Sequence, residues 1–92
     1  MSREREVKEL RVAGKSYVKA VAGSITKSLE EGYKVELTTI GASSANQCCK
    51  AIAMARGFVA TKGKDLICKI GFASTTIDGE EKTCLKFIVT DD

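Results

Sequence analysis

Cysteines are the most reactive side chains in this sequence, and there are four of them: Cys48, Cys49, Cys68 and Cys84. The chain has no histidine, so a cysteine nucleophile lacks an imidazole base and a mixed Cys/His zinc site is excluded. Cys48 and Cys68 fall on apolar faces, where cysteine acts as a small core residue. A thiolate near a helix start, at Cys49, is the thiol chemistry that the pattern leaves open.

Paired carboxylates are a second pattern that suits catalysis. They occur at Glu30-Glu31, Glu80-Glu81 and Asp91-Asp92. Each pair lies at the end of a predicted element or at a turn tip, where acidic side chains are ordinarily solvated. Together with the missing histidine, this predicts a protein that is not an enzyme and that uses no metal and no cofactor.

Two short loops rich in glycine and serine suit anion binding, because each is followed by a helical pattern. They are residues 14–16, with Lys15 at the centre, and residues 41–44. Neither loop has the spacing of a nucleotide phosphate loop. Helix N-termini still offer unpaired amides and partial positive charge, and Lys15 and Lys19 add full charges. Ordinary strand-to-helix turns with serine caps are the alternative.

These loops must be positioned by strands and helices on either side of them. Residues 7–13 alternate as a strand, and residues 33–40 alternate as another. Between them, apolar residues recur at helical spacing from Ser16, and Gly32 is placed to end an amphipathic helix of about four turns. The loops therefore follow the first and second strands.

A second helix is predicted to begin at Ser44. Ser44 and Gln47 fit a capping box, in which the serine oxygen accepts the Gln47 amide proton and the glutamine side chain returns to the cap. Gly57 is one candidate for the end of this helix, and Gly63 is the other. The inward face is predicted to carry Ala45, Cys48, Ile52, Ala55 and Val59.

A hairpin is the clearest local signal in the last third of the chain. Asp78-Gly79 is a preferred two-residue turn, and two long runs with regular apolar positions flank it. Pairing Ile77 with Glu80 fixes the register. That register places Phe72 opposite Leu85, Ile70 opposite Phe87 and Cys68 opposite Val89, so the apolar set shares one face and is expected to form core.

The resulting fold class is an α/β two-layer sandwich with the order β-α-β-α-β-β. The first two strands are expected to be parallel and joined by a right-handed crossover, giving a four-stranded mixed sheet with two helices on one face. The length of 92 residues and the apolar fraction of 43% suit a single domain. We divide the chain into a charged leader, residues 1–6, and one domain, residues 7–92.

Charge is distributed unevenly along the chain. Lys and Arg number 7 against 5 Asp and Glu in residues 1–32, 5 against 1 in residues 33–64, and 3 against 6 in residues 65–92. The basic middle suits an anion-facing edge, and a solvated mixed surface explains it equally well. With no signal peptide pattern and no long apolar run, the sequence predicts a cytoplasmic protein with free thiols and no membrane partner.

Three segments carry a resemblance to a known family. They are "RVAGKSYVKAVAGSI", "TIGASSANQCCKAIAMARGFVA" and "DLICKIGFASTTIDGEEKTCLKFIV". Across nearly the whole chain, these segments resemble the stage V sporulation protein S family. More distantly, the element order, the "GK" loop and the second helix resemble the Alba superfamily of dimeric nucleic-acid-binding proteins.

This resemblance implies a role in bacterial sporulation or its regulation, an Alba-like domain, and a homodimer or higher homo-oligomer. The loop lysine of Alba-like proteins corresponds to Lys15, and their loop glycine to Gly14. Ser16 stands where they often have a second basic residue. Their hairpin commonly reaches into the minor groove with basic residues, whereas residues 78–82 here are largely acidic, which predicts weak, salt-sensitive binding or a different partner.

The leading hypothesis is therefore a small regulator that binds DNA or RNA without sequence specificity and holds phosphates at the edge formed by the first two strand-to-helix loops. The alternative is a protein-interaction or assembly module that acts in sporulation without binding nucleic acid directly. The candidate binding residues are Lys15, Ser16, Lys19, Gly41, Ser43, Ser44, Asn46, Lys50 and Arg56.

Overall fold

The computed structural model describes residues 5–91 and contains four strands and two helices in the predicted order. Residues 1–4 of the predicted leader, and Asp92, lie outside the described residues. The elements are β1 (Val7–Val12), α1 (Val18–Glu30), β2 (Lys34–Thr39), α2 (Ala42–Ala60), β3 (Leu66–Ile77) and β4 (Glu80–Asp91).

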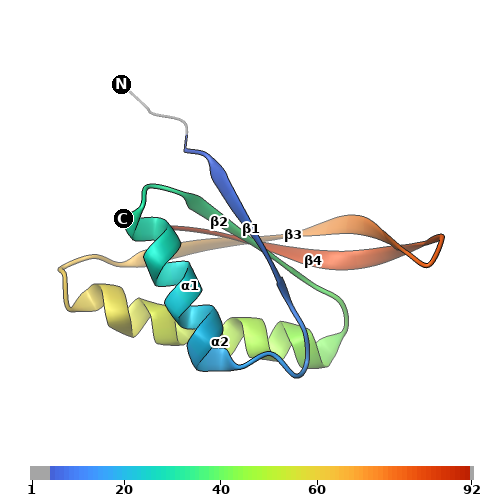
Figure 1. Cartoon of the computed structure of the whole chain (residues 1–92), viewed down its shortest axis with the longest axis horizontal. Helices are drawn as coiled ribbons and strands as arrows, with labels where there is room; N and C mark the ends of the chain where they lie inside the picture. Colours follow the sequence, from blue (N-terminus) through green and yellow to red (C-terminus); the bar gives the residue numbers. More distant parts are fainter. Residues whose placement is uncertain (1–4, 92) are drawn as a thin grey trace.

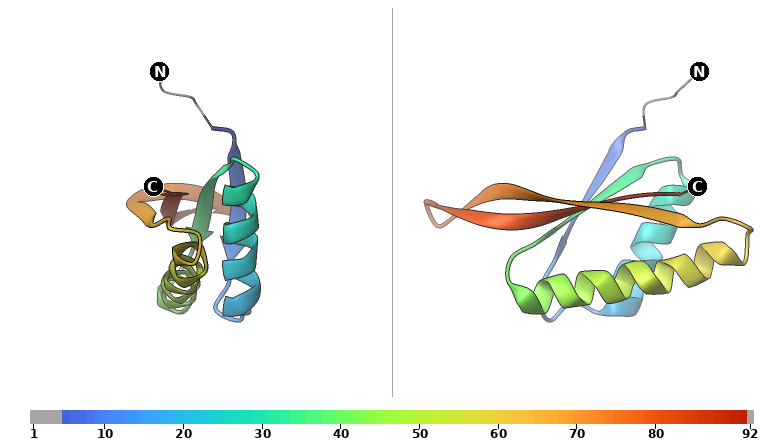
Figure 2. Two further views of the ribbon diagram at one scale, coloured as in Figure 1. Left: turned by 90° about the vertical axis from the view of Figure 1, so that its left-hand side faces the viewer. Right: turned by 180° about the vertical axis from the view of Figure 1, so that it is seen from behind.

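The sheet has the strand order β1-β2-β4-β3, and both helices lie on one of its faces (Figures 1 and 2). The pair β1 and β2 is parallel, whereas β4 runs antiparallel to both of its neighbours. The predicted mixed sheet and two-layer arrangement are thus confirmed. None of the described helices has the length and apolar character that a membrane span requires.

The core lies between the two helices and the centre of the sheet. Strand β2 supplies Val35 and Leu37, which are fully buried, as alternation predicts for the inner face of a central strand. Helix α1 adds Ile25 and α2 adds Cys48, both also fully buried. The remaining members of this cluster are Val12, Ala22, Leu29, Ala51, Ala55, Phe87 and Val89.

Helix α1 begins two residues later than the pattern predicts, at Val18 instead of Ser16. The Ser16 hydroxyl accepts a hydrogen bond from the Ala13 amide (2.8 Å), which holds Ser16 in the preceding turn. At the other end, the Gly32 amide donates to the Leu29 carbonyl and the Tyr33 amide to the Ser28 carbonyl, both at 3.0 Å. This paired termination confirms the predicted stop at Gly32.

Helix α2 begins at Ala42, so the predicted capping box at Ser44 is wrong. Gly41 is the N-cap, with φ of 89°, a backbone conformation that glycine adopts without strain. Ser44 is then the third helical residue, and its hydroxyl donates to the Ile40 carbonyl (2.6 Å) and the Gly41 carbonyl (3.1 Å) instead of receiving an amide. The helix continues past Gly57 and ends at Ala60.

The hairpin has the predicted register, but one of its apolar rows is not core. Phe72 pairs with Leu85 and Ile70 with Phe87, around a turn in which Asp78 and Gly79 both have positive φ. Phe72 is nevertheless 85% exposed and Ile70 60% exposed. Helix α2 packs mainly against α1 and leaves these side chains of edge strand β3 exposed.

The cysteines are likewise divided between buried and exposed positions. Cys48 is buried as predicted, whereas Cys68, in the uncovered row of β3, is exposed, so its assignment to the core is wrong. Cys84 is also buried within the single chain. Cys49 is exposed.

Thr39 is buried without a hydrogen-bond partner for its side chain, and this gives a first prediction. Thr39 is 2% exposed, and its hydroxyl group forms no hydrogen bond with any of residues 5–91. Because an unsatisfied buried hydroxyl costs free energy, we expect Thr39→Val to raise the free energy of unfolding by about 1 kcal/mol. Urea unfolding measures this change, and a loss of stability would show that the hydroxyl has a partner. Val35→Thr, which adds a buried hydroxyl to the same strand, should destabilise the protein.

Candidate functional site

The two strand-to-helix loops lie in contact at one edge of the sheet. A Cβ atom added to Gly14 would lie 2.4 Å from Ser43 Oγ and 3.0 Å from Ser43 Cβ, so the first loop passes directly against the start of α2. The Gln47 side chain also donates to the Ser16 carbonyl at 2.9 Å. The glutamine of the expected capping box thus bridges the two loops instead of capping its own helix.

Lys15 and Lys19 project from the first loop and the first turn of α1. Both are exposed, and neither forms an ion pair or hydrogen bond with any of the residues between 5 and 91. Ser16 is half-buried, and its hydroxyl already accepts the Ala13 amide. Lys15 in the loop and Lys19 in α1 therefore present ammonium groups that no residue of the described part of the chain engages. The Ser16 side chain serves mainly to shape the turn.

Both helix N-termini at this edge lack acidic residues in the first turn. The first amide of α1 with a carbonyl partner is that of Val21, which donates to Tyr17, and the first of α2 is that of Ala45, which donates to Gly41. Earlier amides in each helix have no intrahelical acceptor. A lysine beside the positive end of a helix dipole, as Lys19 is in α1, is unfavourable unless an anion approaches. The edge is therefore an uncompensated positive region.

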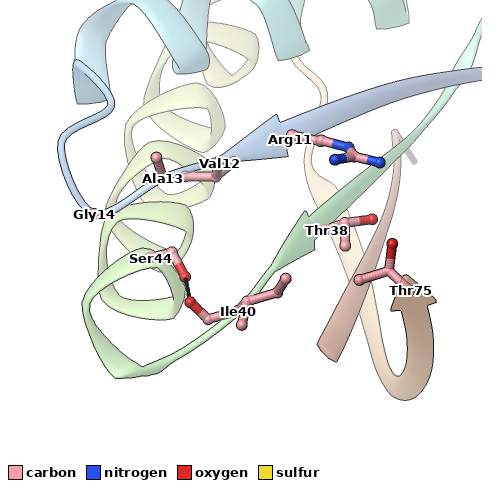
Figure 3. Close-up of a pocket in the computed structure, with 8 residues that line it drawn as sticks. All are labelled: Arg11, Val12, Ala13, Gly14, Thr38, Ile40, Ser44 and Thr75. Carbon is pink, nitrogen blue, oxygen red and sulfur yellow. Dashed lines mark hydrogen bonds between the residues drawn. The ribbon is translucent and has the colours of Figure 1, made fainter. Parts of the chain in front are cut away.

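The predicted residues of α2 are divided along the helix. Gly41 and Ser43 are exposed at its start, next to the first loop, whereas Ser44 is buried. Asn46 and Lys50 are exposed in the following turns. Figure 3 shows Ser44 turned inward to the Ile40 carbonyl, so the Ser44 hydroxyl is occupied within the chain.

Arg56 is not brought to this edge. It lies near the other end of α2, about 20 Å from the helix start at 1.5 Å per residue, and its guanidinium donates to Asp65 at 2.7 and 3.2 Å. The hydrogen bonds and charge of Arg56 lower the pKa of Asp65 below its usual value. Arg56 therefore pairs α2 with the start of β3 and leaves the group of candidate anion-binding residues.

Arg11 lies beside this edge, on the outer face of the sheet, and the sequence analysis did not select it. It lies on β1 and lines a cavity of about 340 Å³ together with Thr38, Ile40 and Thr75 (Figure 3). Strand alternation predicts that Arg11 lies on the polar face of β1. Every outward residue of a strand shares this property, so it does not mark a binding site. The proximity of Arg11 to Thr75 depends on the twist of the β3-β4 hairpin, for which the local pattern holds no signal.

The thiols of Cys48 and Cys68 are not activated. Burial, and to a lesser extent the neighbouring Cys49 and Cys68, raise the pKa of Cys48 to about 12. Loss of solvation and the proximity of Cys49 also raise the pKa of Cys68. Low-pKa thiolates are the reactive form of cysteine, so these two side chains are protonated at neutral pH. Over residues 5–91, no cluster of three or more Cys, Asp or Glu side chains is arranged to hold a metal ion.

The family comparison covers both loops, both helices and the hairpin. The family model of SpoVS, described as Stage V sporulation protein S, matches residues 8–92. This range contains every candidate residue of the loop edge and agrees with the resemblance seen in the sequence. Because the match spans nearly the whole sequence, the chain belongs to the SpoVS family.

Proposed function

We propose that this chain binds the phosphate backbone of nucleic acid, without sequence specificity, at the edge where its first two strand-to-helix loops meet. The observation that carries the proposal is the contact between these loops, which sets two helix N-termini beside the unpaired ammonium groups of Lys15 and Lys19. Backbone amides at helix starts and lysine side chains are both common phosphate ligands. No base-reading element is part of this proposal.

The acidic hairpin tip limits the contact to this edge. Asp78, Glu80 and Glu81 are exposed at the tip, and Lys82 there pairs with Glu80 at 3.5 Å. Phosphates are repelled by these carboxylates, so the hairpin adds no affinity. With few positive groups engaged, binding is weak, and because it is mainly electrostatic it falls further as the salt concentration rises.

Fluorescence anisotropy with labelled DNA and RNA duplexes tests the proposal. We expect binding at about 50 mM salt that weakens steeply towards about 200 mM, with a logarithmic slope near −2 to −4 for two to four neutralised phosphates. Scrambling the duplex sequence should leave the affinity unchanged. Failure to bind either duplex at about 50 mM salt, or binding that ignores salt, contradicts the proposal.

We further propose that two chains associate through the uncovered row of β3, which we define as Cys68, Ile70 and Phe72. Monomeric proteins seldom leave large apolar side chains this exposed, and such patches often mark interfaces. Beside Phe72, the start of α2 and strand β4 form a hollow of about 300 Å³ lined by Ala42, Ala45 and Leu85. A two-fold symmetric dimer would cover this row in both copies and would carry two loop edges.

The same row supports the second candidate function, an assembly module that binds another protein and not nucleic acid. Capture of partners before and after nuclease treatment separates the two functions. A partner that survives nuclease treatment, together with no binding of either duplex, favours the assembly module. Loss of all captured material after nuclease treatment favours nucleic-acid binding.

A further inference from the structure

We propose that the cavity around Arg11 is a binding site for a small organic anion, separate from the phosphate-binding edge. The cavity has a volume of about 340 Å³ and lies between the ends of β1 and β2 and the β3 side of the hairpin (Figure 3). This volume lies at the lower end of the range for small-molecule sites. The proposal does not depend on nucleic-acid binding.

Arg11 forms no ion pair with any of residues 5–91, although Glu9 lies on the same face of β1. Strand pairing places Arg11 beside Thr38, and Thr38 beside Lys86, across the outer face of the sheet. Lys86 is neutralised by Glu36 at 3.1 Å, and that hydrogen bond raises the pKa of Lys86. Glu36 is therefore engaged, and Arg11 remains the free cation of this row.

Two hydroxyl groups lie beside the guanidinium. Figure 3 shows the side chains of Thr38 and Thr75 next to Arg11, with the Thr75 oxygen directed towards Thr38 and Arg11. Neither hydroxyl forms a hydrogen bond with another of the described residues. A guanidinium presents paired N–H donors that match the two oxygens of a carboxylate or phosphate, and a hydroxyl can donate to a remaining oxygen. The polar end of the cavity thus fits one anionic headgroup.

The rest of the cavity is apolar and fits the body of such a ligand. Val12 and Ala13 line it from β1 and the loop that follows, and Ile40 lines it from the end of β2 while remaining 41% exposed. Small-molecule sites typically combine an apolar lining with a few polar groups that orient the ligand. The ligand class is therefore a carboxylate or phosphate carried on a body about the size of a sugar or a short acyl chain.

Arg11 and the loop lysines face different ligands in this arrangement. Arg11 lies on the outer face of the sheet, whereas Lys15 and Lys19 lie in the first loop and on α1. The cavity still includes Gly14 and Ser44, which belong to the two loops. An anion held at Arg11 lowers the positive potential of the neighbouring edge, so a filled cavity should weaken nucleic-acid binding there.

The test is an NMR titration of the isotope-labelled chain at constant ionic strength with ribose 5-phosphate, butyrate, or ribose. Saturable shifts are expected with at least one anion, centred on the amides of Val12, Gly14, Thr38, Ile40 and Thr75, and none with ribose. Arg11→Gln should weaken that binding about tenfold or more, in line with loss of a charge-assisted hydrogen bond. Arg11→Lys should restore part of it, and Lys27→Gln, at an exposed lysine in the last turn of α1, should change it less than about threefold.

Three outcomes overturn the proposal. The first is that both anions give only linear, non-saturating shifts. The second is that Arg11→Gln and Lys27→Gln weaken binding equally, which means a general effect of charge. The third is that Arg11→Gln weakens duplex binding while the wild-type chain binds neither small anion, which assigns Arg11 to the nucleic-acid backbone. If Arg11→Gln misfolds, Thr75→Val serves instead, with an expected loss of about threefold and no change in fold.

Discussion

Replacing Lys15 and Lys19 together with glutamate is expected to abolish duplex binding. The two substitutions change the local charge from +2 to −2 at the point where two helix N-termini already concentrate positive potential. Each lysine that neutralises a phosphate contributes to both affinity and salt dependence, and a glutamate there repels the phosphate. At about 50 mM salt we expect an affinity loss of about 100-fold or more, measured by fluorescence anisotropy.

The matched control is Lys27→Glu with Lys69→Glu. It makes the same change in net charge, and both lysines are exposed, but Lys27 lies in the last turn of α1 and Lys69 on β3. We expect the control to bind within about threefold of wild type at about 50 mM salt, since only a weak long-range effect remains. An equal loss in both double variants would attribute binding to net charge alone. Unchanged binding in the Lys15 and Lys19 variant would place the site elsewhere.

Phe72→Asp is expected to convert the proposed dimer into a monomer. Phe72 is 85% exposed, so a charge at this position costs the isolated chain little. In a dimer that covers the row of Cys68, Ile70 and Phe72, the same substitution removes an aromatic anchor and buries an unpaired carboxylate. The dimer dissociation constant should rise about 100-fold or more. Sedimentation equilibrium over a range of protein concentrations measures this change.

Ile67→Asp provides the control on the other side of the same strand. Ile67 is also exposed, but it faces away from the helical layer and from the proposed interface. We expect this variant to keep the wild-type association constant, and both variants to keep the thermal stability of the monomer. A wild-type chain that stays monomeric at high concentration, or a Phe72→Asp variant that remains dimeric, argues against the interface.

The hairpin shows what local pattern determines and what it does not. A two-residue Asp78-Gly79 turn and regular apolar positions define which residues pair, and the observed pairs agree with the prediction from Cys68-Val89 to Ile77-Glu80. Alternation also tells which side chains share a face. Alternation does not indicate whether another element covers that face. Coverage of β3 depends on the position at which α2 packs in the folded chain.

The position of the candidate site could also be predicted in part from the order of strands and helices. Parallel strands joined by helices bring their following loops to one edge, so Lys15, Lys19 and the start of α2 could be grouped from the sequence. The position of Arg56 away from this edge could not be predicted, because its partner, Asp65, lies beyond the end of the helix. Capping at Ser44 was wrong because Gly41 starts the helix three residues earlier with a positive φ.

The contact between Gly14 and Ser43, and the hydrogen bond from Gln47 to the Ser16 carbonyl, have a consequence for the thermodynamics of recognition. Flexible loops must be ordered when they bind a ligand, and the lost conformational entropy weakens affinity. Here the two loops hold each other at a fixed separation in the free chain. The proposed binding edge thus has a preorganised spacing between its two helix N-termini, and we expect it to favour ligands whose negative groups already match that spacing over flexible polyanions of equal charge.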